Sequence, residues 1–258
     1  MQRIVIKVGS AVLTQDNQIA KERMLNLVSL IAKIKTKYDV ILVTSGAVAA
    51  GYATLKLDKK KQIGKKALAA AGQPILMASY KKKFEIFDID IAQILLTEED
   101  FDSRRRTKMF QEIIDALLAN GILPIVNEND ISSTPEQLFG DNDQLSANVA
   151  HAVDANLLVI LSDIDGYYDK NPKEHSDAKI YPLIQKLPES ALVDEATPNN
   201  EFATGGIVTK LKAAHYMMKR GRQMFLCSGF DLSAAESYLL HQKQTLGTLF
   251  STSKEKQS

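Results

Sequence analysis

Short apolar runs alternate along the chain with longer segments in which apolar residues recur every three or four positions. The short runs are rich in β-branched residues and apolar at almost every position, which is typical of parallel strands buried on both faces. They predict strands at residues 4–8, 40–44, 89–95, 123–126, 157–161 and 224–227.

The longer segments each carry one apolar face, which is the pattern of a helix packed on a sheet. They predict helices at residues 21–36, 67–84, 107–119, 144–153 and 208–220. Regular alternation of strands and helices predicts an α/β fold with crossover connections between parallel strands. Residues 166–187 are predicted to form a loop or hairpin excursion, and residues 197–206 a loop before a helix. No linker divides the chain, so one domain is expected.

Composition narrows the class of protein. The chain has 258 residues, of which 45% are hydrophobic and 24% charged, and its formal net charge is +1. Such a balance argues against a general nucleic-acid or membrane-surface binder, which needs an excess of basic residues. Cys227 is the single cysteine and excludes an intramolecular disulfide. The N-terminus does not have the pattern of a signal peptide, and we expect a cytoplasmic protein.

Polar and glycine residues follow the predicted strands, where ligands bind in open α/β sheets. The pairs at residues 9–10, 45–46 and 205–206 combine glycine with a hydroxyl residue or a second glycine. Each pair fits a tight turn as well as a phosphate-binding loop, but three in one chain favour phosphate. The chain lacks both the G-x-x-x-x-G-K-[ST] and the G-x-G-x-x-G fingerprints, which argues against a P-loop and a dinucleotide-binding dehydrogenase.

Two further features suggest a charged ligand. Lys7 interrupts the apolar run of the first strand, and on a central strand its ammonium group would need an anionic partner. Asp and Asn are concentrated at residues 127–130 and 141–143, where they fit either turn and helix-cap chemistry or a pocket for a zwitterionic ligand.

The remaining chemistry-bearing residues give little support to other sites. The four histidines are scattered without ligand spacing, so a zinc site or a Ser-His-Asp triad is poorly supported. The basic runs at residues 59–61, 81–83 and 104–106 are interpreted as solvated faces, with RNA binding as the minority interpretation.

Several motifs together resemble the amino acid kinase family, and within it the members that phosphorylate L-glutamate. The matching pieces occur in the family's order: IKVGSAVLT, TSGAVAAG, AAAGQ, PIVNEND, GDNDQLSA, LLVILSDIDGYY, ATGGIVTK and the trailing GTLF. The resemblance implies an α/β/α sandwich around a mainly parallel sheet. It also implies ATP-dependent phosphorylation of the side-chain carboxylate of L-glutamate to L-glutamyl 5-phosphate, the first step of proline biosynthesis.

The resemblance also implies roles for individual residues. Lys7 and Lys210 would contact the phosphoryl group, and Asp143 would hold the two lysines in place. Glutamate would be bound by Ser45, Asp130 and Asn142. ATP would be bound by Lys7, Gly9, Ser162, Asp163, Thr204, Gly205, Gly206, Ile207, Val208, Thr209 and Lys210. Mg²⁺ would accompany ATP without assigned protein ligands, because it usually keeps waters and phosphate oxygens.

Other expectations follow from the same resemblance. Residues 1–252 would form the kinase domain and residues 253–258 a polar tail, without the PUA domain of longer members. A dimer or tetramer is expected, and proline is a possible feedback inhibitor acting through the loop at residues 131–140. The alternatives are a family member acting on N-acetylglutamate, aspartate, carbamate or UMP, and a non-catalytic nucleotide-binding regulator.

Overall fold

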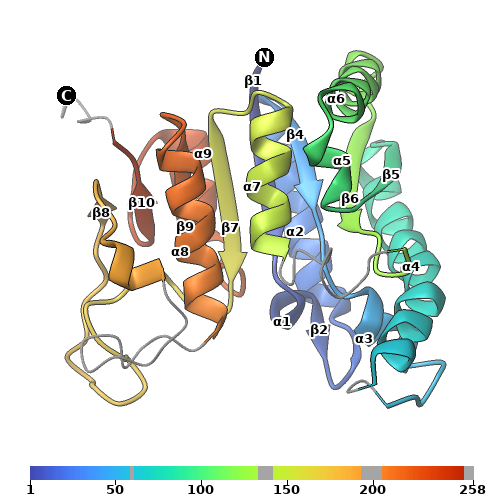
Figure 1. Ribbon diagram of the computed structural model, residues 1–258, viewed down its shortest axis with the longest axis horizontal. Coiled ribbons are helices and arrows are strands. Elements are labelled where there is room, and N and C mark those ends of the chain that lie inside the picture. The colour runs from blue at the N-terminus through green and yellow to red at the C-terminus, as the bar shows by residue number, and fades with distance from the viewer. Residues whose placement is uncertain (59–60, 133–141, 193–204, 253–258) are drawn as a thin grey trace.

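An eight-stranded sheet forms the centre of the molecule, with the strand order β5-β6-β4-β1-β7-β9-β10-β8 (Figure 1). The structure is a computed structural model and describes all residues except 59–60, 133–141, 193–204 and 253–258. The strands are β1 (Gln2–Val8), β4 (Tyr38–Val43), β5 (Ile91–Leu96), β6 (Leu123–Glu128), β7 (Leu157–Ser162), β8 (Leu183–Ile184), β9 (Gln223–Ser228) and β10 (Thr248–Phe250). All six predicted strands are present.

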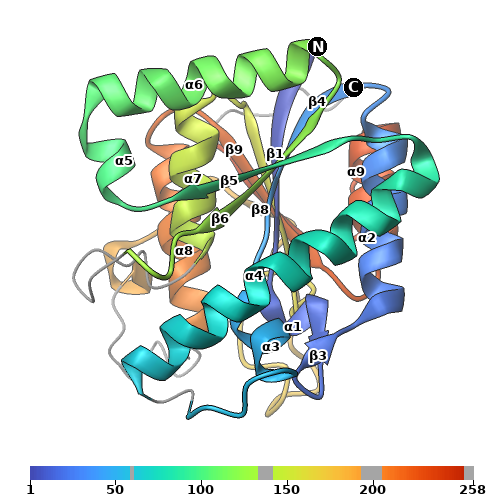
Figure 2. The same ribbon diagram turned by 90° about the vertical axis from the view of Figure 1, so that its right-hand side faces the viewer.

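Helices cover both faces of this sheet, as Figure 2 shows in side view. One face carries α2 (Lys21–Ile34), α4 (Gln62–Phe84) and α9 (Ser233–His241), and the other carries α6 (Arg104–Ala119), α7 (Asn142–Ala152) and α8 (Gly205–Met218). Side chains alternate along β1, so Ile4, Ile6 and Val8 enter the first core and Val5 enters the second. The predicted three-layer α/β/α sandwich is therefore confirmed.

The strand order places β1 in the middle, with β4 parallel to it on one side and β7 parallel to it on the other. The chain builds the β4 side first and then crosses to the β7 side, so the carboxyl ends of β1, β4, β6 and β7 meet where the sheet order reverses. Figure 1 shows α1 (Ser10–Leu13), β2 (Thr14–Gln15) and α3 (Ala47–Tyr52) gathered at this end. This is the end of an α/β sheet at which ligands bind.

Short elements differ from the sequence-based prediction. β10 pairs antiparallel with β9 and parallel with β8, and was not predicted because three residues carry no periodicity. α9, α1, α3 and α5 (Glu99–Asp102) were also not predicted. The excursion expected at residues 166–187 contains one antiparallel bridge, between Tyr168 and Ile180, and ends in β8.

A tight hairpin joins β2 to β3 (Gln18–Ile19). Asp16 and Asn17 form its turn with φ angles of 51° and 59°. Asp and Asn tolerate this left-handed conformation better than other side chains, and two such residues in succession suit a two-residue hairpin. The hairpin matters because it carries Asn17 to the carboxyl end of the sheet.

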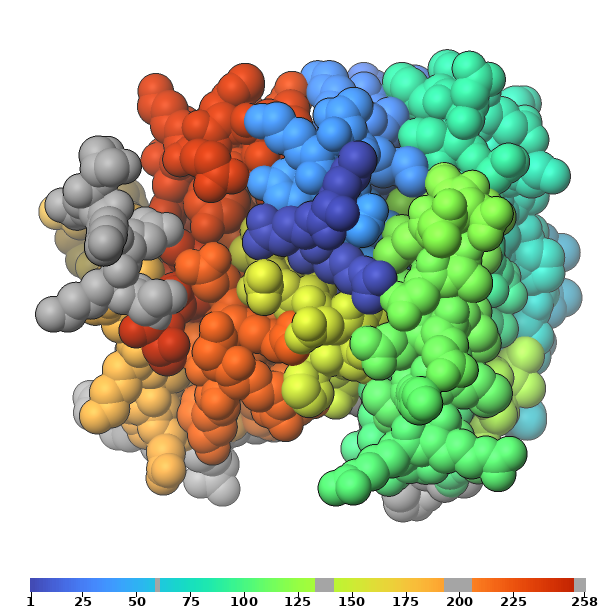
Figure 3. Space-filling model, turned by 90° about the horizontal axis from the view of Figure 1, so that it is seen from above, coloured from blue at the N-terminus to red at the C-terminus, as the bar shows by residue number. Residues whose placement is uncertain are grey.

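The opposite end of the molecule is formed by the beginnings of the strands. Figure 3 shows this face, with the N-terminal segment in the middle, between the C-terminal elements and α6. Arg3 lies here and forms an ion pair with Asp115 at 2.6 Å. None of the helices in the described part of the chain combines the length and apolar character needed to cross a bilayer.

Candidate active site

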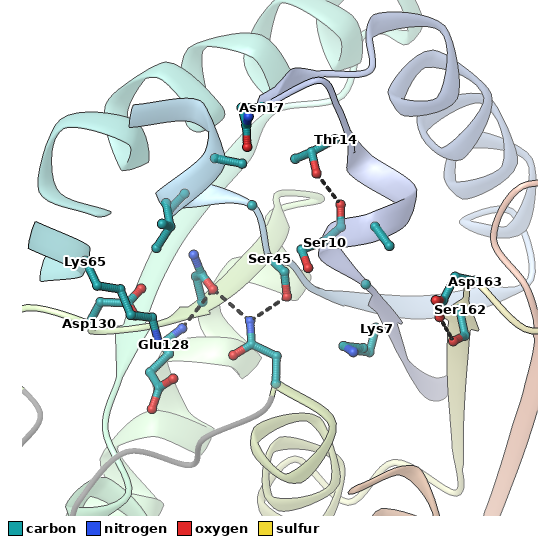
Figure 4. A pocket seen from close by; sticks show the side chains of 18 of the residues that line it. Lys7, Ser10, Thr14, Asn17, Ser45, Lys65, Glu128, Asp130, Ser162 and Asp163 are labelled. Carbon is teal, nitrogen blue, oxygen red and sulfur yellow. Dashed lines mark hydrogen bonds between the residues drawn. The ribbon is translucent and has the colours of Figure 1, made fainter. Parts of the chain in front are cut away.

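A cleft of about 660 Å³ opens at the carboxyl ends of the central strands (Figure 4). The loops after β1, β4, β6 and β7 supply most of its walls, and α7 and α8 supply one residue each. Among the described residues its lining comprises Lys7, Gly9, Ser10, Ala11, Thr14, Asn17, Ser45, Gly46, Ala47, Val48, Ala49, Lys65, Asn127, Glu128, Asp130, Asn142, Ser162, Asp163 and Lys210. Eight of these are residues to which the sequence analysis assigned a role: Lys7, Gly9, Ser45, Asp130, Asn142, Ser162, Asp163 and Lys210.

Two lysines from distant parts of the chain meet on one carboxylate. The ammonium of Lys7 donates to Oδ1 of Asp143 at 2.5 Å, and that of Lys210 donates to Oδ2 at 3.1 Å. Strand alternation points Lys7 to the same face as Val5, where α7 and α8 pack, and this is why the three residues meet. Asp143 is fully buried, and Lys7 and Lys210 are only 4% and 7% exposed.

The charge state of the Asp143 carboxyl follows from its surroundings. Burial opposes ionisation of Asp143, but the ammonium groups of Lys7 and Lys210 outweigh burial and hold its pKa below the ordinary value. The carboxylate is therefore ionised at neutral pH. It offsets the repulsion between the two lysines and keeps both ammonium groups beside the cleft.

Residues near the start of α8 support the same carboxylate. The Thr209 hydroxyl donates to Oδ2 of Asp143 at 3.0 Å, and Lys210 also donates to the Gly206 carbonyl at 2.9 Å. Val208 is buried and Ile207 packs against the second core, so these two side chains do not face the cleft. Thr204 lies outside the described residues, and Gly205 and Gly206 open the helix.

On the other side of the cleft, the Asn142 amide is held in one orientation. Its nitrogen donates to the Thr44 carbonyl at 2.5 Å, the Ser45 hydroxyl at 2.8 Å and the Asn127 side-chain oxygen at 3.0 Å. A backbone carbonyl only accepts hydrogen bonds, so the group facing it must be the amide nitrogen. The oxygen of Asn142 is consequently the atom left to accept from a ligand.

A chain of amides continues behind Asn142. Asn127 donates to Gln73 at 2.8 Å, and Gln73 donates to Gln93 at 3.2 Å. Since Asn142 occupies one acceptor site of the Ser45 hydroxyl, the proton of that hydroxyl can point to a ligand carboxylate. This wall of the cleft therefore offers both an acceptor and a donor to a zwitterion.

Asp130 lies next to this amide wall, after β6. Burial raises the pKa of its carboxyl, and the nearby Lys65 and Lys66 only partly oppose that effect. Lys65, in the first turn of α4, lines the cleft together with Asp130, whereas Lys66 donates to the Ile131 carbonyl at 3.0 Å. Figure 4 shows Lys65 and Asp130 adjacent to each other.

The β1 and β7 loops form the opposite wall. Ser162 donates to the Asp163 carboxylate at 3.0 Å, and both lie at the end of β7. The N–H group of Gly9 donates to the Leu161 carbonyl at 3.0 Å, so this amide is already engaged. The phosphate-binding role expected of the first glycine loop stays a prediction, and Ser10 and Ala11, the two residues after Gly9, also line the cleft.

The donor chemistry of the cleft is compatible with a hard cation that arrives with a phosphate group. Asp163 and Ser162 present oxygen atoms, which Mg²⁺ prefers. Within the described part of the chain, no three His, Cys, Asp or Glu side chains are grouped so as to hold a metal ion. A magnesium ion would therefore take most of its ligands from phosphate and water.

The sequence analysis gave no site role to Gln73, Lys65 or Asn17, and it included Asn127 only as part of the polar segment at residues 127–130. Gln73 and Asn127 belong to quoted motifs, AAAGQ and PIVNEND, and their side chains could have been suspected on that ground. Lys65 carries no comparable signal, because one lysine in the first turn of a helix is common on any surface. The loop proposed for proline feedback, at residues 131–140, is described only at Ile131 and Ser132.

Comparisons with known proteins show to which family the chain belongs. Residues 2–228 match the profile of the amino acid kinase family. A glutamate 5-kinase from Wolinella succinogenes is 54% identical over 255 residues, which cover 97% of this chain and 98% of that protein. A glutamate 5-kinase from Leishmania donovani is 51% identical over 250 residues, covering 97% of this chain and 95% of that protein.

Solved structures agree on the fold. An isopentenyl phosphate kinase superposes with a TM-score of 0.67 at 16% identity, covering 96% of this chain and 100% of that one. At this identity the likeness supports the three-layer architecture alone.

Proposed function

The chain belongs to the amino acid kinase family, and we propose that it transfers the γ-phosphoryl group of ATP to the side-chain carboxylate of L-glutamate. The product is L-glutamyl 5-phosphate, and the reaction is the first step of proline biosynthesis. The identity of the acceptor rests on relatives named glutamate 5-kinase that match nearly the whole chain. The pairing of Lys7 and Lys210 on buried Asp143 is the structural observation that carries the kinase chemistry.

The reaction needs alignment and charge neutralisation more than proton transfer. A γ-carboxylate with an ordinary pKa near 4.3 is ionised at neutral pH and needs no general base to attack phosphorus. Two anions must nevertheless approach in line, and charge develops on the transferred group. Two ammonium groups held beside the cleft supply the compensating positive charge, and this supports a role for Lys7 and Lys210 at the phosphoryl group.

Asp143 serves in this scheme as a positioning residue. Its carboxylate accepts from both lysines and from Thr209, so it fixes three donors without facing the substrate. The amides of Ser10, Ala11, Gly205 and Gly206 are candidates to bind phosphate oxygens.

Ser162 and Asp163 would lie at the nucleotide side of the cleft, opposite the amide wall. When bound, Mg²⁺ neutralises charge on the transferring phosphates. Asp163 and Ser162 would offer it oxygen ligands.

Glutamate would occupy the side formed by Ser45, Asn142 and Asp130. The Ser45 hydroxyl can donate to a carboxylate, and the Asn142 oxygen and the Asp130 carboxylate can accept from an ammonium group. The orientation of the Asn142 amide supports this assignment of donors and acceptors to the two charged groups of glutamate. A homo-oligomer, feedback by proline and a cytoplasmic location remain predictions from the sequence.

A hydroxylamine trap tests the activity and the acceptor together. The protein is incubated with ATP, Mg²⁺, hydroxylamine and one acid at a time, and acyl phosphate is detected as its hydroxamate. We expect hydroxamate from L-glutamate and none above background from N-acetylglutamate or aspartate. Hydroxamate from aspartate alone would overturn the proposed acceptor.

A further inference from the structure

Two side chains of opposite charge, Lys65 and Asp130, line the cleft at the end away from Asp163. Figure 4 shows Lys65 and Asp130 side by side, with Ser45 between them and Lys7. Lys65 belongs to the first turn of α4 and Asp130 follows β6, so two separate elements supply the pair. Both residues line the cleft.

Asp130 is a carboxylate whose charge the protein compensates poorly. Burial raises its pKa, and the lysines beside it do not cancel that effect. In the described part of the chain its side chain accepts no hydrogen bond, whereas the Asn127 amide donates to Gln73 and accepts from Asn142. A carboxylate in this situation favours a cationic ligand such as an α-ammonium group.

Lys65 differs from its sequence neighbour. Lys66 is turned to the Ile131 carbonyl, whereas Lys65 makes no side-chain hydrogen bond or ion pair with the residues that the structure describes. The cationic side chains that line the described cleft are Lys7, Lys65 and Lys210. Of these, Lys7 and Lys210 form ion pairs with Asp143. Lys65 is therefore the cation available for an anionic group other than the phosphates and the reacting carboxylate.

L-Glutamate presents such a group. When its γ-carboxylate lies at the reacting end, its α-carboxylate and α-ammonium lie together at the other end. A lysine beside a carboxylate offers the complementary pair of charges. We propose that Lys65 binds the α-carboxylate of the substrate while Asp130 faces the α-ammonium, so that Lys65 makes an α-amino acid a better substrate than a simple ω-amino acid. This inference rests on the proposed phosphorylation of L-glutamate.

Two analogues separate the two halves of the pair. 4-Aminobutyrate keeps the reacting carboxylate and the ammonium group but lacks the α-carboxylate. Glutarate keeps a carboxylate at that end but lacks the ammonium group. Each is measured as a substrate and, where turnover is too slow, as a competitive inhibitor against L-glutamate.

We expect Lys65→Met to raise KM for L-glutamate about 10- to 100-fold, the loss that corresponds to one charge-assisted hydrogen bond. KM for ATP should stay within about twofold of the wild-type value, because the contact that the substitution removes is made to glutamate and not to ATP. Binding of glutarate should weaken as well, whereas binding of 4-aminobutyrate should stay within about twofold. Lys65→Arg keeps the charge and should retain most of the affinity for L-glutamate.

Two matched variants complete the experiment. Asp130→Asn should show the opposite pattern, weakening 4-aminobutyrate and sparing glutarate. Lys81→Met removes the same charge from an exposed position in the last turn of α4 and should leave every constant unchanged.

Equal losses for L-glutamate and 4-aminobutyrate in Lys65→Met, or an unchanged KM for L-glutamate, would overturn the proposal. A wild-type protein that forms no hydroxamate from L-glutamate would instead contradict the proposed function.

Discussion

At the scale of single residues, one carboxylate compensates two ammonium groups. Asp143 is fully buried and each of its oxygens accepts from a different lysine. Loss of its charge would leave Lys7 and Lys210 close together without a counter-ion. Breaking a buried ion pair in this way costs more than the intact pair contributes, because an uncompensated charge stays buried.

We therefore expect Asp143→Asn to lower the free energy of unfolding by roughly 3–5 kcal/mol at neutral pH. The pKa of Asp143 is lowered by folding, so its stabilising effect is present above the ordinary Asp pKa and is lost as the pH falls through the lower folded value. The difference in the free energy of unfolding between the wild type and Asp143→Asn should therefore shrink in that acid range.

Urea unfolding as a function of pH measures this difference. Asp154→Asn is the control, because Asp154 forms an ion pair with Arg222 while 79% of its side chain is exposed, and exposed pairs contribute little. A pH-independent difference for Asp143→Asn would show that its charge is not the cause.

Lys210 is expected to act on the transferred group itself. Lys210→Ala should lower kcat by roughly 10²–10³ with a smaller effect on KM for L-glutamate, by analogy with the loss of one transition-state donor. Initial-rate kinetics with ATP and L-glutamate measure both constants. Lys219→Ala, an exposed lysine just after α8, is the matched control. Turnover equal to the wild type would exclude the role given to Lys210.

At the scale of elements, two glycines let α3 and α4 touch backbone to backbone. A Cβ atom at Gly72 would lie 1.8 Å from the Ala47 carbonyl oxygen, and one at Gly51 would lie 1.9 Å from the Leu68 carbonyl oxygen. α3 begins directly after Gly46, whose φ of 103° is a conformation that favours glycine. The close crossing therefore fixes Ser45 at one edge and Gln73 at the other.

We expect Gly72→Ala to force the two helices apart. Overpacking of this kind costs about 1–3 kcal/mol in the free energy of unfolding, and KM for L-glutamate should rise because Ser45 and the amide chain shift. Urea unfolding and steady-state kinetics measure the two effects. Ala70→Ser on the exposed side of the same helix should change neither. Normal stability together with normal KM would mean that the helices tolerate the extra carbon.

At the scale of the whole molecule, the cleft lies between two halves of the sheet that are built from different parts of the chain. The loops after β4 and β6 form one wall and the loop after β7 forms the other. A ligand that bridges these walls binds the folded state only and stabilises it by mass action. At a ligand concentration of about 100 Kd, the free energy of unfolding rises by about 2.7 kcal/mol.

We therefore expect ATP with Mg²⁺ at that concentration to raise Tm by roughly 5–10 °C. L-Glutamate should raise Tm as well, and Lys65→Met should reduce only the glutamate effect. Thermal unfolding followed by fluorescence or circular dichroism measures the shifts, with magnesium chloride alone as the control. No shift with ATP would contradict nucleotide binding in this cleft.

The sequence by itself determined the α/β class, the six long strands and the clustering of polar residues at strand ends. Those features are local, because apolar periodicity and β-branched runs of four to seven residues carry them. The interruption at Lys7 also marked a residue that needs an anion, since a charge in an apolar strand is costly. The site residues named from the resemblance lie in or beside one cleft, with Thr204 outside the described residues.

Only the tertiary structure decided which of these residues meet. Asp143 lies 136 positions from Lys7 and 67 from Lys210, and nothing in local periodicity pairs them. The orientation of the Asn142 amide depends on a carbonyl 98 positions away. Lys65 and Lys66 are identical in type and adjacent in sequence, yet only Lys65 lines the cleft, because helix geometry turns successive side chains by about 100°. Long-range packing, which sequence patterns do not encode locally, converts a set of polar residues into a site.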